Sequence, residues 1–231
     1  MNILSCSVRS ARSLSLLVAC AAATVAGSLL AADRSTPGEA PVYATIEEAI
    51  ARGDADDVRR HLSRDPASVN GKPDARMVPL HAAILRRQTA IAVLLLEHGA
   101  DVQAPDTAGR TPLHLAVERN DPALVQELLR RKADTMKRDR IGWTPLHHAA
   151  AKTRLEIARL LLAAGANPNF LSELGGTALH EAAAAGSVEM VKLLLERGVD
   201  PTVRSKPGVT ALDLAREYGH PEVAALLEAR R

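Results

Sequence analysis

Aromatic residues are scarce in this sequence, at only 2% of the chain: one Trp, two Tyr and one Phe. Aromatic side chains normally supply large units of buried area in a globular core. Charged residues, at 24%, and apolar residues, at 47%, are still frequent enough to exclude wholesale disorder. The core must therefore be built from Ala, Leu and Val.

Cysteine is also scarce, and its two occurrences, Cys6 and Cys20, both fall within the segment 1–32. If that segment is removed, the rest of the chain contains no thiol. Disulfide bonds, a thiolate nucleophile and a cysteine-based zinc site are then excluded from the mature domain.

Neither sign of charge prevails, with 29 basic and 27 acidic residues. Two of the basic residues, Arg9 and Arg12, lie in the segment 1–32, which contains no acid, so the remaining chain is balanced at 27 of each. Binding to phosphate groups requires clustered Lys and Arg. The composition therefore argues against a nucleic-acid partner, and against a membrane contact outside the first segment.

Residues 1–32 have the pattern of a targeting segment. A basic start precedes an apolar run from Leu14 to Ala32, and the first acid of the chain follows directly. This order is typical of a secretory signal peptide, with small residues for cleavage after Ala26 or Ala32. We predict export to the periplasm or out of the cell, and we interpret residues 33–44 as a short flexible linker.

Three alternatives to a cleaved signal peptide remain open. The apolar run from Leu14 to Ala32 is long enough to act as an uncleaved membrane anchor in the cell envelope. The tetrapeptide LVAC, ending at Cys20, resembles a lipoprotein cleavage box that would make Cys20 a lipidated N-terminus, although the residues after it stay apolar. An organelle transit peptide fits the Arg and Ser content, but not the long uncharged block.

The rest of the chain repeats with a fixed period. The tetrapeptides VPLH, TPLH, TPLH, TALH and TALD begin at positions 78, 111, 144, 177 and 210, so the period is 33, and one further step back reaches Thr45. One leucine recurs at the same position of all six units: Leu62, Leu95, Leu128, Leu161, Leu194 and Leu227. Six copies without an insertion are a strong signal of stacked structural repeats.

Over residues 45–231 the sequence resembles the ankyrin-repeat family. The segments that carry the resemblance include DTAGRTPLHLAVERND, IARLLLAAGANPN and GGTALHEAAAAGSVEMVKLLLERGVD. The resemblance implies an all-α solenoid in which each unit is a β-turn finger followed by two antiparallel helices.

Local signals agree with this resemblance. Thr111 and Pro112 suit a helix start, because Thr caps free amides and Pro is preset for the first helical position. Glycines at one repeated position suit the helix end: Gly99, Gly165 and Gly198. Lys132 stands at that position in the third unit, so we expect strain of roughly 1 kcal/mol there if the conformation is left-handed.

The two end units differ from the others. Glu47 replaces the Leu of the Thr-Pro-Leu-His motif in the first unit, and Asp213 replaces the His in the last. A terminal repeat has no neighbour on its outer side, so a polar face keeps the array soluble. We predict an N-terminal cap at 45–77, four internal repeats at 78–204 and a C-terminal cap at 205–231.

One histidine recurs in each internal repeat: His81, His114, His147 and His180. Stacked helices lie about 8–10 Å apart, whereas zinc–nitrogen bonds are about 2.0–2.1 Å, so one ion cannot bind them together. The resemblance implies an architectural role near the helix start. No catalytic, metal or cofactor motif is present, and we expect neither enzymatic activity nor a cofactor.

We expect the partner to bind where the repeats differ. The segments TMKRDRIGW and NFLSELGG, in two adjacent fingers, hold the only Trp and the only Phe, and interfaces concentrate binding energy in such residues. The alternatives are that Trp143 packs on the next finger, Phe170 closes a turn, and the neighbouring charges are solvated. His148 shares its position with Leu115 and Glu181, and we expect it to be exposed, as a partner contact or a solvated helix residue. The predicted partner-binding residues are Lys137, Arg138, Arg140, Trp143, His148, Phe170, Leu171, Leu174 and Glu181.

The sequence as a whole predicts a non-catalytic, monomeric protein-binding module in the periplasm or cell envelope. It would recognise a protein through its concave helices and finger tips, as solenoids commonly do. The alternatives are an effector that acts on a host protein after secretion, or an inhibitor or immunity protein for a toxin. Contact with a membrane is expected only through residues 1–32, if they are uncleaved or lipidated at Cys20.

Overall fold

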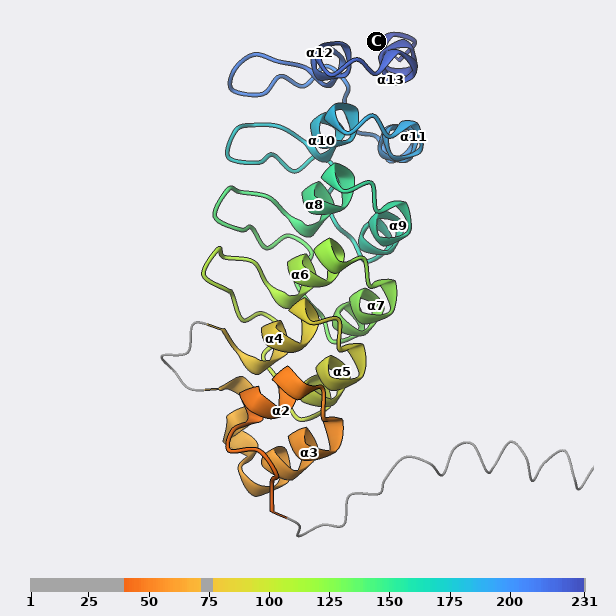
Figure 1. Cartoon of the computed structure of the whole chain (residues 1–231). Helices are drawn as coiled ribbons and strands as arrows, with labels where there is room; N and C mark the ends of the chain where they lie inside the picture. Colours follow the sequence, from red (N-terminus) through yellow and green to blue (C-terminus); the bar gives the residue numbers. More distant parts are fainter. Residues whose placement is uncertain (1–39, 72–76, 231) are drawn as a thin grey trace, which may run out of the picture. The chain divides into compact units, whose positions relative to one another are not determined.

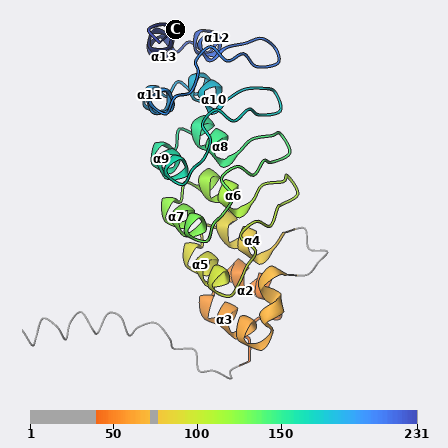
Figure 2. The same cartoon turned by 180° about the vertical axis from the view of Figure 1, so that it is seen from behind.

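The computed structural model describes residues 40–71 and 77–230. The predicted signal peptide or anchor, 1–32, and residues 33–39 of the predicted linker lie outside the described residues. Within them the chain forms twelve α-helices and one short 3-10 helix, and no strand. The helices pair in chain order and the pairs stack on one another (Figures 1 and 2). The predicted all-α repeat fold is confirmed.

Each pair contributes one helix to an inner layer, beside the fingers, and one to an outer layer (Figure 1). The inner helices are α2 (Ile46–Arg52), α4 (Pro79–Leu85), α6 (Pro112–Arg119), α8 (Pro145–Ala151), α10 (Ala178–Ala184) and α12 (Ala211–Glu217). The outer helices are α3 (Ala55–Arg64), α5 (Thr89–Glu97), α7 (Pro122–Arg130), α9 (Leu155–Ala163), α11 (Val188–Glu196) and α13 (Pro221–Glu228); the 3-10 helix η1 is Pro66–Asn70. We name the fully described fingers A (101–110), B (134–143), C (167–176) and D (200–209).

The recurring histidines hold the inner helices to the fingers. The Thr111 N–H donates to His114 Nδ1 at 3.1 Å, and His114 Nε2–H donates to the carbonyl of Trp143 in the next finger, also at 3.1 Å. Similar contacts join His147 to Gly176 and His180 to Val209. Burial lowers the pKa of His114 and of His147 to about 4, which keeps each ring neutral. The architectural role implied for these residues is confirmed.

Four outer helices, α5, α7, α9 and α11, are followed by a left-handed residue, and the glycine pattern predicts this for three of them. Gly99, Gly165 and Gly198 have φ angles of 88°, 90° and 79°. Lys132 adopts φ 62° at the same position, so the expected strain in the third unit is present. A left-handed conformation costs a residue with a side chain about 1 kcal/mol more than glycine.

The core follows the repeated positions. The six recurring leucines, from Leu62 to Leu227, are all buried. A second position on the inner helices is fully buried and holds only small residues after the first unit: Ala83, Ala116, Ala149, Ala182 and Ala215. The expectation of a core made from Ala, Leu and Val is therefore correct. The boundaries of the two caps stay predictions.

Candidate functional site

Fingers B and C end in tight turns of the same geometry. In finger B the Asp139 N–H donates to the Trp143 carbonyl at 3.0 Å, which leaves Arg140 and Ile141 at the tip. In finger C the Ser172 N–H donates to the Gly176 carbonyl at 2.8 Å. Glu173 and Leu174 form its tip.

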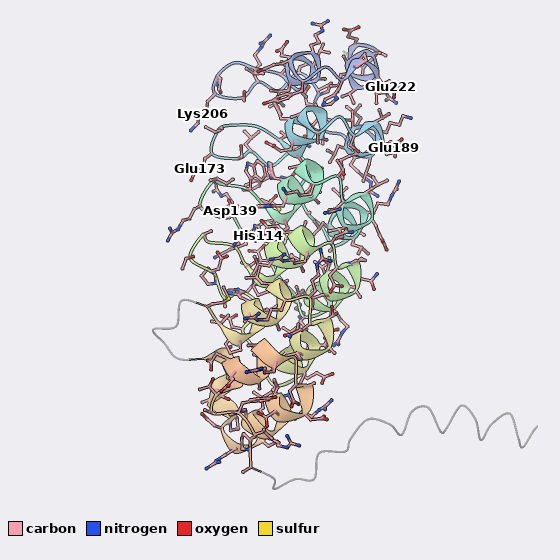
Figure 3. All side chains as sticks on the ribbon, viewed as in Figure 1. His114, Asp139, Glu173, Glu189, Lys206 and Glu222 are labelled. Atoms are coloured by element: carbon pink, nitrogen blue, oxygen red, sulfur yellow. The ribbon has the colours of Figure 1, made fainter. Side chains whose placement is uncertain are left out.

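Neighbouring fingers are joined through their backbones. The Arg140 N–H donates to the Ala108 carbonyl of finger A at 2.9 Å, and the Lys206 N–H of finger D donates to the Leu174 carbonyl of finger C at 2.7 Å. Figure 3 shows Glu173 and Lys206 at the finger ends, on the opposite side of the array from Glu189 and Glu222. These bonds join finger A to finger B and finger C to finger D.

Exposed aliphatic side chains gather on fingers B and C. Ile141 is 55% exposed, Leu171 is 47% exposed and Leu174 is 67% exposed. Leu171 and Leu174 are among the predicted partner-binding residues. Ile141 was missed, although it precedes Leu174 by one repeat period and could have been found by comparing the two turns.

Exposed basic residues lie on the same finger as Ile141. Lys137, Arg138 and Arg140 are exposed on finger B. The Arg138 guanidinium carbon lies 5.1 Å from the centre of the Phe170 ring in finger C, within the range of a cation–π contact. Phe170 is half-buried. We call Arg138, Arg140, Ile141, Leu171 and Leu174 the finger-tip surface.

The expectation that His148 and Leu115 are exposed is wrong. His148 is only 6% exposed and Leu115 is fully buried. His148 Nε2 lies 2.8 Å from Asp139 Oδ2, and its Nδ1 lies 3.4 Å from Glu118 Oε1. Glu118 in turn accepts a hydrogen bond from Arg110 Nη1 at 2.9 Å. The imidazole is therefore held inside a polar network that links finger B to α6 and α8.

Asp139 is a buried structural acceptor, not one of a group of solvated charges as expected. Its Oδ1 accepts the N–H groups of Ile141 and Trp143, at 3.0 and 2.9 Å, and its Oδ2 faces His148. Asp106, one period earlier, accepts the corresponding bonds from Ala108 and Arg110. Asp106 and Asp139 are one repeat period apart in the sequence, and this spacing could have identified the turn of finger B.

Trp143 packs against α8. Its half-buried ring stacks on His147 at a centroid distance of 6.3 Å and meets His148 edge-on at 5.1 Å. The ring lies against the start of α8 in its own repeat. Its predicted contact with a partner stays a prediction, since one face of the ring is committed to packing.

Glu181 lies on α10 at the position that His148 occupies on α8. It is half-buried, and burial raises the pKa of its carboxyl to about 7. The predicted residues thus divide between the finger-tip surface with Lys137 and Phe170, and the inner helices with His148 and Glu181. Trp143 lies between these two groups.

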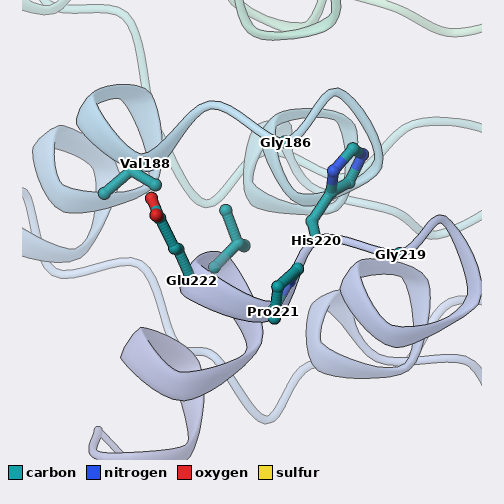
Figure 4. A pocket seen from close by; sticks show the side chains of 7 residues that line it. Gly186, Val188, Gly219, His220, Pro221 and Glu222 are labelled. Atoms are coloured by element: carbon teal, nitrogen blue, oxygen red, sulfur yellow. The ribbon is translucent and has the colours of Figure 1, made fainter.

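A shallow pocket of about 180 Å³ lies at the turns between helices of the last two repeats (Figure 4). Its lining includes Gly186, Val188, His220 and Glu222, and the His220 Nε2–H donates to the Ala184 carbonyl at 3.0 Å. Pockets for drug-sized ligands are usually about 300–1,000 Å³. Among residues 40–71 and 77–230 there is no group of three or more His, Cys, Asp or Glu suited to a metal ion, and no helix of that part has the length and apolar character needed to cross a bilayer.

Comparison with known families agrees with the repeat geometry. A family model described as ankyrin repeats (3 copies) matches residues 46–139, 104–171 and 163–230. The chain belongs to the ankyrin-repeat family. Ankyrin repeats are generally protein-interaction modules and typically lack catalytic activity. A search of curated proteins finds no match.

Proposed function

We propose that this ankyrin-repeat protein is a non-catalytic module, exported to the periplasm or cell envelope, that binds a protein partner through its inner helices and finger tips. The observation that carries the proposal is the finger-tip surface. Its three aliphatic side chains are about half exposed or more, and arginines lie beside them. Exposed apolar groups that gather in one place mark interaction sites more often than scattered ones do.

The rigidity of the fingers supports the same proposal. Backbone hydrogen bonds join the tip of finger B to finger A and the tip of finger C to finger D, and so restrain each tip. A surface that is already ordered loses less conformational entropy on binding. Affinity then depends on the side chains that the tips present.

Export is proposed from the order of residues in the first segment: a basic start, an apolar run and then the first acid. The test is the intact mass of the chain recovered from its native cells. Cleavage after Ala26 or Ala32 supports a signal peptide, and a lipid on Cys20 supports anchoring in the envelope. A full-length chain found inside the cell would contradict export.

The binding proposal is tested by crosslinking capture from the native organism with the full chain as bait. A Leu171→Ser, Leu174→Ser double variant should recover less of the partner than the wild-type chain. The matched control is Tyr218→Ser, which removes a 59% exposed apolar side chain from the turn after α12 and should leave capture unchanged. Equal capture by all three chains would contradict the role of the finger-tip surface.

A further inference from the structure

Glu181 carries a carboxyl group that no other described residue neutralises. The side chain is half-buried, and it forms no hydrogen bond or ion pair within residues 40–71 and 77–230. Burial alone accounts for its raised pKa. Partial removal of a carboxylate from water is unfavourable unless an opposite charge or a hydrogen-bond donor replaces the lost hydration.

The preceding repeat shows how the equivalent position is satisfied. There His148 meets the Asp139 carboxylate at 2.8 Å and the edge of the Trp143 ring at 5.1 Å, both from finger B. In finger C those two positions hold Ser172 and Gly176. The Ser172 hydroxyl accepts the N–H of Gly176 at 3.2 Å, and glycine has no side chain to lay over α10. Finger C therefore provides Glu181 with neither an ionic partner nor a cover.

Packing does not require the glycine at position 176. A Cβ atom added there would lie 3.6 Å from the Cβ of His180 and from the hydroxyl of Ser172, which are ordinary contact distances. Gly176 is also not among the glycines with a left-handed backbone. A Cβ atom is thus compatible with this turn, and the buried Gly176 contributes no side-chain contact to Glu181.

Finger C and α10 themselves carry acidic groups and no basic one that is charged near pH 7. Between Asn167 and Ala184, which spans finger C and α10, the ionisable residues are Glu173, His180 and Glu181. Burial lowers the pKa of His180, so that ring stays neutral near pH 7. Arg138 and Arg140 belong to finger B, and Arg204 and Lys206 belong to finger D; none of these cations contributes to the raised pKa of Glu181. A cation is therefore the complement of finger C and α10.

The helices packed against α10 do not supply that cation. Their ionisable groups are His147 and His148 on α8 and Asp213, Arg216 and Glu217 on α12. On α11 the ionisable groups are Glu189, Lys192 and Glu196, all of them exposed. None of these groups contributes to the raised pKa of Glu181.

We propose that Glu181 forms the subsite for a lysine or arginine side chain of the protein partner. The inference rests on the proposed function, since it concerns the same inner helices and fingers. A guanidinium group can donate two parallel hydrogen bonds to a carboxylate, and an ammonium group offers a compact charge. Either replaces the hydration that burial removes, and finger C offers no cation of its own to compete for the carboxylate.

Proton linkage gives this subsite a measurable signature. A cation that binds the ionised carboxylate lowers the pKa of Glu181, and by reciprocity its affinity rises as the carboxyl ionises. Affinity should increase by up to about tenfold per pH unit below pH 7 and level off above it. Glu181→Gln keeps the shape of the side chain but removes the charge, and should abolish this dependence.

The first experiment uses the full chain and side-chain analogues. Carboxyl ¹³C NMR follows the titration of Glu181 with methylguanidinium or methylammonium, and with sodium at the same ionic strength. The internal control is Glu189, an exposed carboxyl on α11 (Figure 3). We expect a lowered pKa at Glu181 with the organic cations and no change at Glu189. Equal shifts at both carboxyls, or none at Glu181, overturn the proposal.

The second experiment uses the partner once it is captured. Glu181→Gln should weaken its binding by about tenfold or more at pH 8, as expected for loss of a charge-assisted contact, whereas Glu189→Gln should not. Thermal unfolding of both variants checks that the array stays folded. A partner bound equally by Glu181→Gln overturns the cation subsite but leaves the binding function intact. A partner indifferent to the Leu171→Ser, Leu174→Ser variant overturns the proposed function, while the NMR titration still decides the subsite.

Discussion

The Nε2 atom of His148 lies 2.8 Å from Oδ2 of Asp139, and this contact fastens α8 to the finger that precedes it. The same carboxylate organises the turn through two backbone N–H groups. Finger B is therefore braced from within, by a pair of polar side chains that are both buried.

Asp139→Ala should destabilise the array by about 1–3 kcal/mol, because two backbone donors and His148 lose their acceptor in a buried setting. Urea unfolding followed by circular dichroism measures the loss. The matched control in the same finger is Asp134→Ala, which removes an exposed carboxylate and should cost under about 1 kcal/mol. Similar losses of unfolding free energy for both variants would show that the buried contacts of Asp139 do not stabilise finger B.

Stability should fall as the pH is lowered from about 6.5 to 4. Burial depresses the pKa of His114 and His147 from the ordinary 6.5 to about 4, so the unfolded chain takes up protons that the folded chain does not bind. The stability that these neutral rings support is complete above pH 6.5. As the pH falls from 6.5 to 4, the free energy of unfolding decreases by up to about 1.4 kcal/mol per pH unit for each ring. Unfolding free energies measured across this range should show a shallower slope for His147→Asn than for the wild-type chain. The same slope for His147→Asn and for the wild-type chain would show that His147 is not a buried neutral ring with a lowered pKa.

Leu161→Ala should cost about 2–5 kcal/mol, because the side chain is fully buried and its removal leaves a cavity. Leu174→Ala makes the same chemical change at a finger tip that is 67% exposed, and should alter stability by less than about 0.5 kcal/mol. Thermal unfolding of the two variants side by side checks the assignment. Equal melting temperatures would show that Leu161 is not a core residue.

Lys132→Gly should stabilise the third unit by about 1 kcal/mol, since its φ of 62° suits glycine better than a residue with a side chain. Gly165→Ala tests the reverse change in the next unit. A Cβ there would meet no atom within 4 Å, so any loss of stability reports the left-handed backbone alone. Chemical denaturation should move the two variants in opposite directions, and a shift in the same direction would contradict this explanation.

The fold could be predicted because the constant repeat period aligns equivalent positions of the units. Buried leucines and alanines, helix starts at Thr-Pro and left-handed helix ends all recur at fixed positions, so each unit supports the interpretation of the next. Even the strained Lys132 was identified by comparison with Gly99, Gly165 and Gly198. The capping role of His114 followed from the family resemblance in the same way.

The site could be predicted only in part, because alignment compares equivalent positions and does not show contacts between different ones. His148 was expected to be exposed since its equivalents, Leu115 and Glu181, vary. Its burial depends on Asp139 and Trp143, which the turn of finger B brings over α8. Ile141 was missed for a simpler reason: in finger B the prediction rested on Trp143 and the basic residues, and this exposed aliphatic residue lies between them in the sequence.

The absence of a side chain at Gly176 has a consequence for how recognition is encoded. Because neither packing nor a left-handed conformation demands glycine there, the choice of residue is free of the folding requirements that govern most of the repeat. An added methyl group therefore fits at position 176, and selectivity at α10 can change while the repeat framework stays the same. Adjacent repeats share the same framework but can then carry different contact residues, so that each repeat recognises a different group of the same protein partner.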